Sequence, residues 1–121
     1  MGQSPISPSD LSASYSSPRT VPRYIFVAVT EIIESTSQAC ILGKTSKISC
    51  KGCYVDTLNP LPTGTFLNMV ISRDQGSFAT KGKVIYVHEG VGMGVVFLDP
   101  TGDQMKILRS WLAESSRTDT P

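Results

Sequence analysis

The sequence has 121 residues, of which 40% are hydrophobic and 17% charged, and its formal net charge is +1. This length suits one domain with a modest core, and the near-neutral charge argues against a general electrostatic surface for DNA, RNA or membranes. No apolar run reaches the roughly 20 residues that span a bilayer, and the N-terminus lacks an apolar signal segment, so we expect no membrane insertion and no export. Three cysteines without an export signal indicate a reducing, cytoplasmic location.

The chain begins with a segment that is rich in serine and proline, and we predict that residues 1–17 are disordered. In the next segment, residues 18–23, each of two prolines is followed by an arginine, Arg19 and Arg23. Proline favours an extended chain, in which residues four apart project to the same side. Arg19 and Arg23 can therefore clamp one planar or anionic group, although two arginines beside a loop are more often simply solvated.

A series of short β-type segments follows, separated by turn sequences. The expected strands are 24–33, 39–45, 47–55, 65–72, 77–88 and 93–98. Residues 59–64 combine two prolines with a glycine and predict a loop. About six strands with short connections and no intervening helix predict a mostly β fold, either an antiparallel barrel or a sandwich.

The last part of the chain changes its hydrophobic period from strand to helix. Met105, Leu108, Trp111 and Leu112 fall on one helical face. The preceding residues include three capping types, Asp99, Thr101 and Asp103, and Pro100 suits a helix start. We predict a helix over residues 102–113 that packs its apolar face on the sheet. The polar residues 114–121 are expected to form a flexible tail.

The segment Lys47–Val55 has strand composition with an unusual polar pattern. Lys47 and Ser49 are two residues apart, which places them on one face of a strand, and Gly52 follows. A glycine weakens a strand unless the strand bulges or another group approaches its backbone closely. The segment is therefore either a ligand-facing rim or a solvated surface strand with a bulge.

Three motifs together resemble the PilZ domain, a family of bacterial cyclic di-GMP receptors. Arg19-Thr20-Val21-Pro22-Arg23 resembles the family's Arg-x-x-x-Arg arm ahead of the first strand. Ser49-Cys50-Lys51-Gly52 resembles the second half of its Asp/Asn-x-Ser-x-x-Gly motif, and Gly92–Phe97 followed by a helix resembles its closing strand and lid. The resemblance covers residues 18–113.

This resemblance implies a six-stranded antiparallel PilZ-type β-barrel with a C-terminal α-helix and with cyclic di-GMP held on the outside of the barrel. The implied ligand-binding residues are Arg19, Arg23, Lys47, Ser49 and Gly52. The first motif position departs from the family, because Lys47 stands where Asp or Asn is expected and lacks their acceptor oxygen. We therefore expect a receptor with weakened affinity that signals to an unidentified protein partner. The alternative is a degenerate protein-interaction adaptor that does not bind cyclic di-GMP.

Two other classes of function are weaker alternatives. Cys50 and Cys53 form a Cys-x-x-Cys pair that Cys40 and His88 could complete as a zinc or redox site, but odd spacing on one strand places the pair on opposite faces. We expect the cysteines to act as small packing residues, with no metal or other cofactor. The carboxylates are scattered, and the single histidine has no identifiable nucleophile partner, so no enzyme is predicted.

Overall fold

The computed structural model describes residues 21–74 and 76–119. The predicted disorder of residues 1–17 and the position of Arg19 lie outside the described residues. The elements are β1 (Tyr24–Glu34), β2 (Cys40–Ile48), β3 (Gly52–Asp56), β4 (Phe66–Arg73), β5 (Gly76–His88), β6 (Gly92–Leu98) and α2 (Gly102–Asp119).

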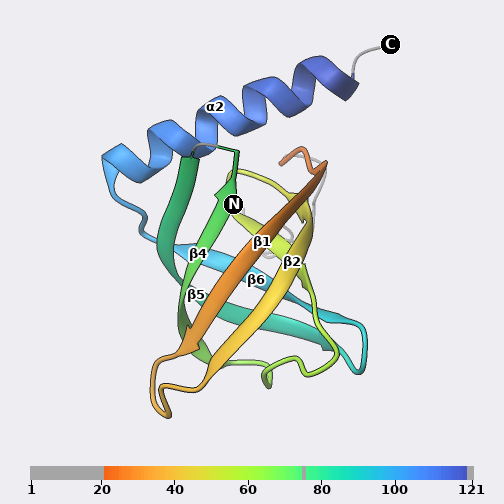
Figure 1. Ribbon diagram of the computed structural model, residues 1–121, viewed down its shortest axis with the longest axis vertical. Coiled ribbons are helices and arrows are strands. Elements are labelled where there is room, and N and C mark those ends of the chain that lie inside the picture. The colour runs from red at the N-terminus through yellow and green to blue at the C-terminus, as the bar shows by residue number, and fades with distance from the viewer. Residues whose placement is uncertain (1–20, 75, 120–121) are drawn as a thin grey trace, which may run out of the picture.

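Within the described residues, six antiparallel strands close into a barrel (Figure 1). The strand order around the barrel is β1-β2-β3-β6-β5-β4, and β4 pairs with β1 to complete the circle. The prediction of a closed six-stranded barrel with a C-terminal helix is thus confirmed. Closure pairs every strand on both sides, so the described barrel has no open sheet edge.

The alternation of side chains along β1 shows how the sequence forms this barrel. Phe26, Ala28, Thr30 and Ile32 are buried, whereas the residues between them, such as Val27 and Val29, are exposed. The buried hydroxyl of Thr30 donates a hydrogen bond to the carbonyl of Val70 at 3.0 Å, which offsets the cost of burying this polar group. Inward-facing residues of all six strands fill the barrel interior, including Ile48, Val55, Leu67, Met69, Ile71, Phe78, Val84, Met93 and Val95.

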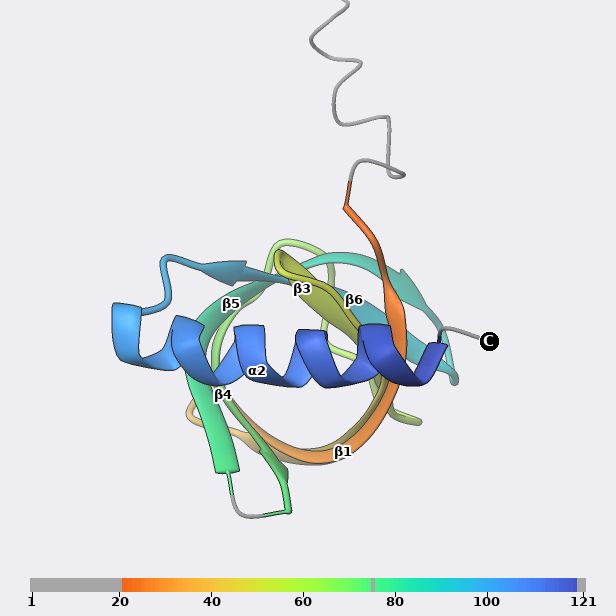
Figure 2. The same ribbon diagram turned by 90° about the horizontal axis from the view of Figure 1, so that it is seen from above.

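The helix α2 lies across one end of the barrel (Figures 1 and 2). Thr101 caps its start, since the Gln104 backbone N–H donates to the Thr101 hydroxyl oxygen at 3.3 Å. Trp111 faces inward, and its ring centroid lies 5.1 Å from that of Phe26. No helix in the part of the chain that the structure describes is long and apolar enough to span a membrane.

Two boundary predictions were wrong. Residues 47–55 are not one strand, because β2 ends at Ile48, a tight turn follows, and β3 begins at Gly52. The helix does not end at Ala113 but continues to Asp119, through residues predicted to be a flexible tail. Ser115 explains the second error, because it is 8% exposed and extends the buried stripe of Leu108 and Trp111. A small polar residue carries no hydrophobic signal, although its position is buried.

Candidate functional site

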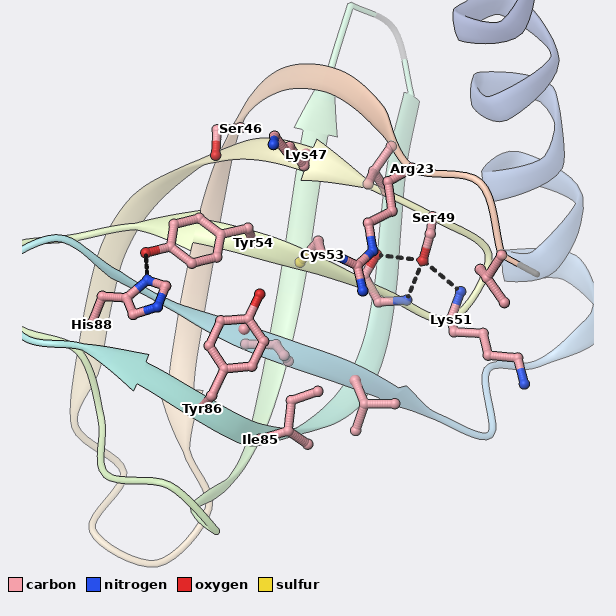
Figure 3. A pocket seen from close by; sticks show the side chains of 16 residues that line it. Arg23, Ser46, Lys47, Ser49, Lys51, Cys53, Tyr54, Ile85, Tyr86 and His88 are labelled. Atoms are coloured by element: carbon pink, nitrogen blue, oxygen red, sulfur yellow. Dashed lines mark hydrogen bonds between the residues drawn. The ribbon is translucent and has the colours of Figure 1, made fainter. Parts of the chain in front are cut away.

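The turn between β2 and β3 is held by the side chain of Ser49. Its hydroxyl oxygen accepts hydrogen bonds from the backbone N–H groups of Lys51 at 3.1 Å and Gly52 at 3.2 Å (Figure 3). The Ser49 backbone N–H also donates to the Gly52 carbonyl at 2.8 Å. Ser49 is only 7% exposed. This residue therefore fixes the shape of the turn, in addition to lining the pocket described below.

The sequence suggested two reasons for a glycine at position 52, a bulge or the close approach of another group to the backbone. The structure shows the second. A Cβ atom on Gly52 would lie 2.2 Å from the carbonyl oxygen of Val95, well inside van der Waals contact. The approaching group is the backbone of β6, with which Gly52 pairs opposite Val96. The absence of a side chain here is thus explained by the barrel itself.

Lys47 lies on the outer face next to a β-bulge. Thr45 pairs with Val55, and the next pair joins Lys47 to Tyr54. One extra residue, Ser46, is inserted between these pairs, so Ser46 and Lys47 both line the outer pocket. Bulges of this kind re-aim side chains and are common beside functional sites.

Arg23 reaches the same pocket from the segment just ahead of β1. Its side chain is exposed and points toward the turn that contains Ser49 (Figure 3). The structure thus brings together four of the five predicted site residues, Arg23, Lys47, Ser49 and Gly52, around one pocket. Arg19, the fifth, lies outside the described residues, so the two-arginine clamp stays a prediction.

Three aromatic side chains, which we call the ring cluster, line the opposite side of this pocket: Tyr54 of β3 and Tyr86 and His88 of β5 (Figure 3). Their ring centroids are separated by 6.1 Å for the two tyrosines, 5.7 Å for Tyr54 and His88, and 5.4 Å for Tyr86 and His88. The Tyr54 hydroxyl lies 2.9 Å from Nδ1 of His88. Burial, together with the neighbouring Tyr86 and Asp56 groups, raises the pKa of Tyr54 above its usual value.

Two glycines of β6 make room for the ring cluster. A Cβ atom on Gly94 would lie 2.4 Å from the Tyr86 ring, and one on Gly92 would lie 2.7 Å from the Tyr54 ring. Gly94 pairs with Tyr54 on one side and with Tyr86 on the other, so both rings flank a bare stretch of strand. The sequence analysis did not predict the ring cluster. The signal that could have found it is the pair of glycines two apart in a strand, opposite two strands with tyrosine.

A second β-bulge lies on the ring-cluster side of the pocket. Val84 pairs with Val95 and Tyr86 pairs with Gly94, which leaves Ile85 as the inserted residue. Ile85 and Tyr86 are consecutive, and both line the pocket, with 50% and 40% of their surfaces exposed. The pocket is thus bordered by a bulge in β2 and a bulge in β5.

The pocket has a volume of about 600 Å³ and combines positive charge with apolar surface. Arg23, Lys47 and Lys51 contribute cations, whereas none of the described residues that line it is acidic. The ring cluster and Ile85 supply flat or apolar surface on the other side. Such a site suits a ligand that is both anionic and aromatic.

The cysteines do not form the alternative metal site. The expectation that all three cysteines act as packing residues is wrong for Cys40 and Cys50, which are exposed, because Cys40 begins β2 and Cys50 lies in the turn between β2 and β3. Cys53 is buried in the barrel interior as expected, and burial raises the pKa of its thiol to about 12. Across residues 21–74 and 76–119, no group of three or more His, Cys, Asp or Glu side chains is placed to hold a metal ion. The structure therefore brings Cys50, Cys53, Cys40 and His88 into no common ligand set.

Comparisons with known proteins place this geometry in a family. The protein-family model of the PilZ domain matches residues 16–114. A solved Bacillus subtilis inhibitor of motility, MotI/DgrA, superposes with a TM-score of 0.71 at 15% identity over 85% of this chain. The PilZ domain of Escherichia coli YcgR, solved with c-di-GMP, superposes with a TM-score of 0.69 at 13% identity, covering 82% of this chain and 92% of that domain.

A third solved structure, the PilZ domain of CeSA from a cellulose-synthesizing bacterium, has a TM-score of 0.58 at 17% identity and covers 73% of this chain and 92% of that domain. The chain spans only 53% of the Bacillus subtilis protein, which is the longer molecule. No curated protein matches the sequence significantly. At these identities the structural likenesses establish the fold.

Proposed function

The chain belongs to the PilZ domain family, and from this premise we propose that it binds cyclic di-GMP in the outer pocket and relays the signal to a protein partner. The proposed role is that of a cytoplasmic receptor or adaptor without an enzymatic activity of its own. The E. coli domain that shares this fold is a c-di-GMP complex, and the same ligand is proposed here.

The chemistry of the pocket is the main support for this function. Cyclic di-GMP is a dianion with two guanine bases, so it needs positive charge for its phosphates and flat surfaces for its bases. Arg23, Lys47 and Lys51 supply the charge without any acidic side chain among the described lining residues. Guanine presents O6 and N7 as acceptors, and a guanidinium such as that of Arg23 can donate to both.

The turn of β2 and β3 supports the same assignment. The buried Ser49 hydroxyl and the backbone of Gly52 give the pocket a fixed rim next to Arg23. Because this turn is held by its own hydrogen bonds, binding does not have to order it. A preorganised rim of this kind favours affinity for a rigid cyclic ligand.

Lys47 is the reason to expect weakened affinity. Asp or Asn at this position would accept hydrogen bonds from guanine N–H groups, whereas an ammonium group only donates. Guanine donors that lose water without finding a partner cost about 1–3 kcal/mol. Pairing of Lys47 with a phosphate of the ligand offsets part of this cost, so we propose that binding is weakened and not abolished.

The second candidate function is a protein-interaction adaptor that no longer binds nucleotide. The observation that favours it is the same lysine, because the Asp or Asn of the motif is missing from an otherwise similar turn. The two functions differ in a measurable way. In a pull-down from host extract, a receptor should retain its partner in a nucleotide-dependent manner. A pure adaptor should retain the same partner equally with and without nucleotide.

Isothermal titration calorimetry with cyclic di-GMP tests the proposal. We expect saturable binding by the wild type and a loss of about 10- to 150-fold for Arg23→Ala, since a charge-assisted hydrogen bond contributes roughly 1.5–3 kcal/mol. Arg109→Ala is the matched control, because Arg109 is an exposed arginine of α2 outside the pocket. Absence of binding at near-millimolar ligand would exclude the receptor function and leave the adaptor.

A further inference from the structure

The ring cluster of Tyr54, Tyr86 and His88 lies on the outer face of the barrel, where it contributes nothing to the interior core. Its members come from β3 and β5, two strands that are separated by β6. Aromatic rings that cover glycines shield the strand backbone and stabilise a sheet, so the two tyrosines have a structural role as well. Here the rings lie over two glycines and beside the cationic side of the pocket.

We propose that the ring cluster is a stacking platform that holds a second purine base, separate from the base held by Arg23, Ser49 and Gly52. This inference rests on the proposed function, since it assigns the second guanine of the cyclic dinucleotide. It concerns residues outside the two sequence motifs that suggested the site.

The position of the rings relative to the strand supports stacking. A Cβ atom on Gly94 would contact Cε2 and Cζ of Tyr86 at 2.4 Å, so the Tyr86 ring lies directly over the backbone of β6. The Tyr54 ring covers Gly92 in the same way, with contacts at 2.7 and 2.8 Å. A ring that packs flat on a strand has its other face open to solvent. In Figure 3 the open faces of the Tyr54 and Tyr86 rings are seen from outside the barrel.

The ring cluster is held in place before any ligand binds. The Tyr54 hydroxyl is 2.9 Å from His88 Nδ1, which ties the two strands that carry the rings. The bulge at Ile85 turns Ile85 and Tyr86 to the same pocket, which brings an apolar side chain next to the ring. Stacking on such a fixed surface loses little conformational freedom on binding.

The platform and the motif side belong to one pocket, which suits a ligand with two bases. Lys47 and Tyr54 are directly paired across β2 and β3, so the cationic side and the rings meet at that pair. One pocket of about 600 Å³ includes both sides. A single mononucleotide would leave one of the two sides unused, whereas a cyclic dinucleotide has a base for each.

Nuclear magnetic resonance of the full chain tests the platform directly. Aromatic carbon–proton spectra are recorded during titration with cyclic di-GMP and, separately, with GMP. We expect saturable shifts of the Tyr54, Tyr86 and His88 ring signals with both ligands, because each brings a guanine to the rings. We also expect Tyr86→Ala to weaken cyclic di-GMP binding by about 5- to 150-fold. This range is typical when an aromatic side chain that stacks on one base is replaced by alanine.

Two variants control this measurement. Tyr86→Phe keeps the ring and should keep the affinity within about twofold, since stacking uses the ring face and not the hydroxyl. Phe66→Ala removes an aromatic side chain that is 52% exposed on β4 but does not line the pocket, and should leave the affinity unchanged.

The possible results separate the two proposals. Cyclic di-GMP binding that shifts the Ser49 and Gly52 amides, leaves the ring signals in place and tolerates Tyr86→Ala would overturn the platform and keep the receptor function. Ring shifts with GMP, together with no shift of any protein signal and no calorimetric heat with cyclic di-GMP, would keep the platform as a base-binding surface and overturn the receptor function. No ring shift with either nucleotide would overturn the platform.

Discussion

The hydroxyl of Tyr54 lies 2.9 Å from Nδ1 of His88, and this contact links β3 to β5 across the intervening strand β6. Neither residue pairs with the other through the backbone, so the side chains make the connection. The contact is possible because Gly92, which pairs with both Asp56 and His88, has no side chain between them.

Tyr54→Phe should therefore lower the free energy of unfolding by about 0.5–1.5 kcal/mol. We expect a value at the low end of this range, because the hydrogen bond is exposed to solvent. Urea denaturation measures this change. In a His88→Ala background the same substitution should cost almost nothing, because the partner is already absent. An equal cost in both backgrounds would show that Tyr54 acts through packing and not through this hydrogen bond.

Gly52→Ala and Gly94→Ala should have different effects, although both positions are tightly packed. The methyl group at position 52 meets the Val95 carbonyl oxygen at 2.2 Å, so backbone must move, and we expect a loss of about 1–3 kcal/mol in unfolding free energy. At position 94 it meets the Tyr86 ring, whose rotation costs less. Gly94→Ala should thus change stability less and displace the ring, which the Tyr86 ring signals report.

Local signals predicted the strands and the C-terminal helix, whereas the choice of a barrel over a sandwich came from the family resemblance. Alternating apolar residues such as Phe26, Ala28 and Ile32 set the strands, and the capping residue Thr101 set the start of the helix. Antiparallel strands with short connections then leave few topologies. The break between β2 and β3 was missed because Cys50 and Cys53 have strand-like composition, whereas the turn depends on the Ser49 hydroxyl.

The site was predicted only where it follows short motifs. Arg23, Lys47, Ser49 and Gly52 came from spacing and resemblance, and the structure brings them to one pocket. The ring cluster could not be predicted in this way, because Tyr54 and Tyr86 are 32 positions apart and meet only through the pairing of β3 and β5 with β6. Contacts between distant strands depend on register, and the β-bulge at Ile85 changes the register between β5 and β6 here.

The cysteines should react in two classes. Cys40 and Cys50 are exposed, whereas burial raises the pKa of Cys53 from 9.0 to about 12. At mildly alkaline pH the native protein should therefore expose two reactive thiols per chain to a chromogenic disulfide reagent, with the third reacting only after denaturation. Cys53→Ala should remove the slow thiol and leave the fast ones. Rapid reaction of all three would contradict the placement of Cys53 in the barrel interior.

Trp111→Ala should be the most destabilising of these substitutions. The Trp111 ring packs on Phe26 and Phe78 at the end of the barrel that α2 covers, and the residue is 7% exposed. Removal of a buried tryptophan costs about 3–5 kcal/mol, which thermal or urea denaturation can measure. Arg109→Ala, at an exposed position of the same helix, should change stability by less than about 0.5 kcal/mol. Equal losses of unfolding free energy for Trp111→Ala and Arg109→Ala would show that α2 does not pack tightly on the end of the barrel.

Lys47→Asp should strengthen cyclic di-GMP binding at moderate ionic strength. Lys47 faces the pocket beside Tyr54 and close to the Ser49 turn, so an aspartate there supplies the acceptor that guanine N–H groups lack. A good directional pair contributes about 1–3 kcal/mol. The lost positive charge near a dianion opposes this gain by on the order of 1 kcal/mol, and salt weakens that opposing effect.

Calorimetry over a series of salt concentrations measures both contributions to the effect of Lys47→Asp. The affinity ratio of variant to wild type should increase with salt, because screening removes the charge penalty and leaves the short-range hydrogen bonds. Lys51→Asp is the control, since it changes the same charge at an exposed pocket residue that is not the motif position, and it should only weaken binding. If Lys47→Asp binds more weakly at every salt concentration, then Lys47 contacts a phosphate, and the guanine edge lies elsewhere in the pocket.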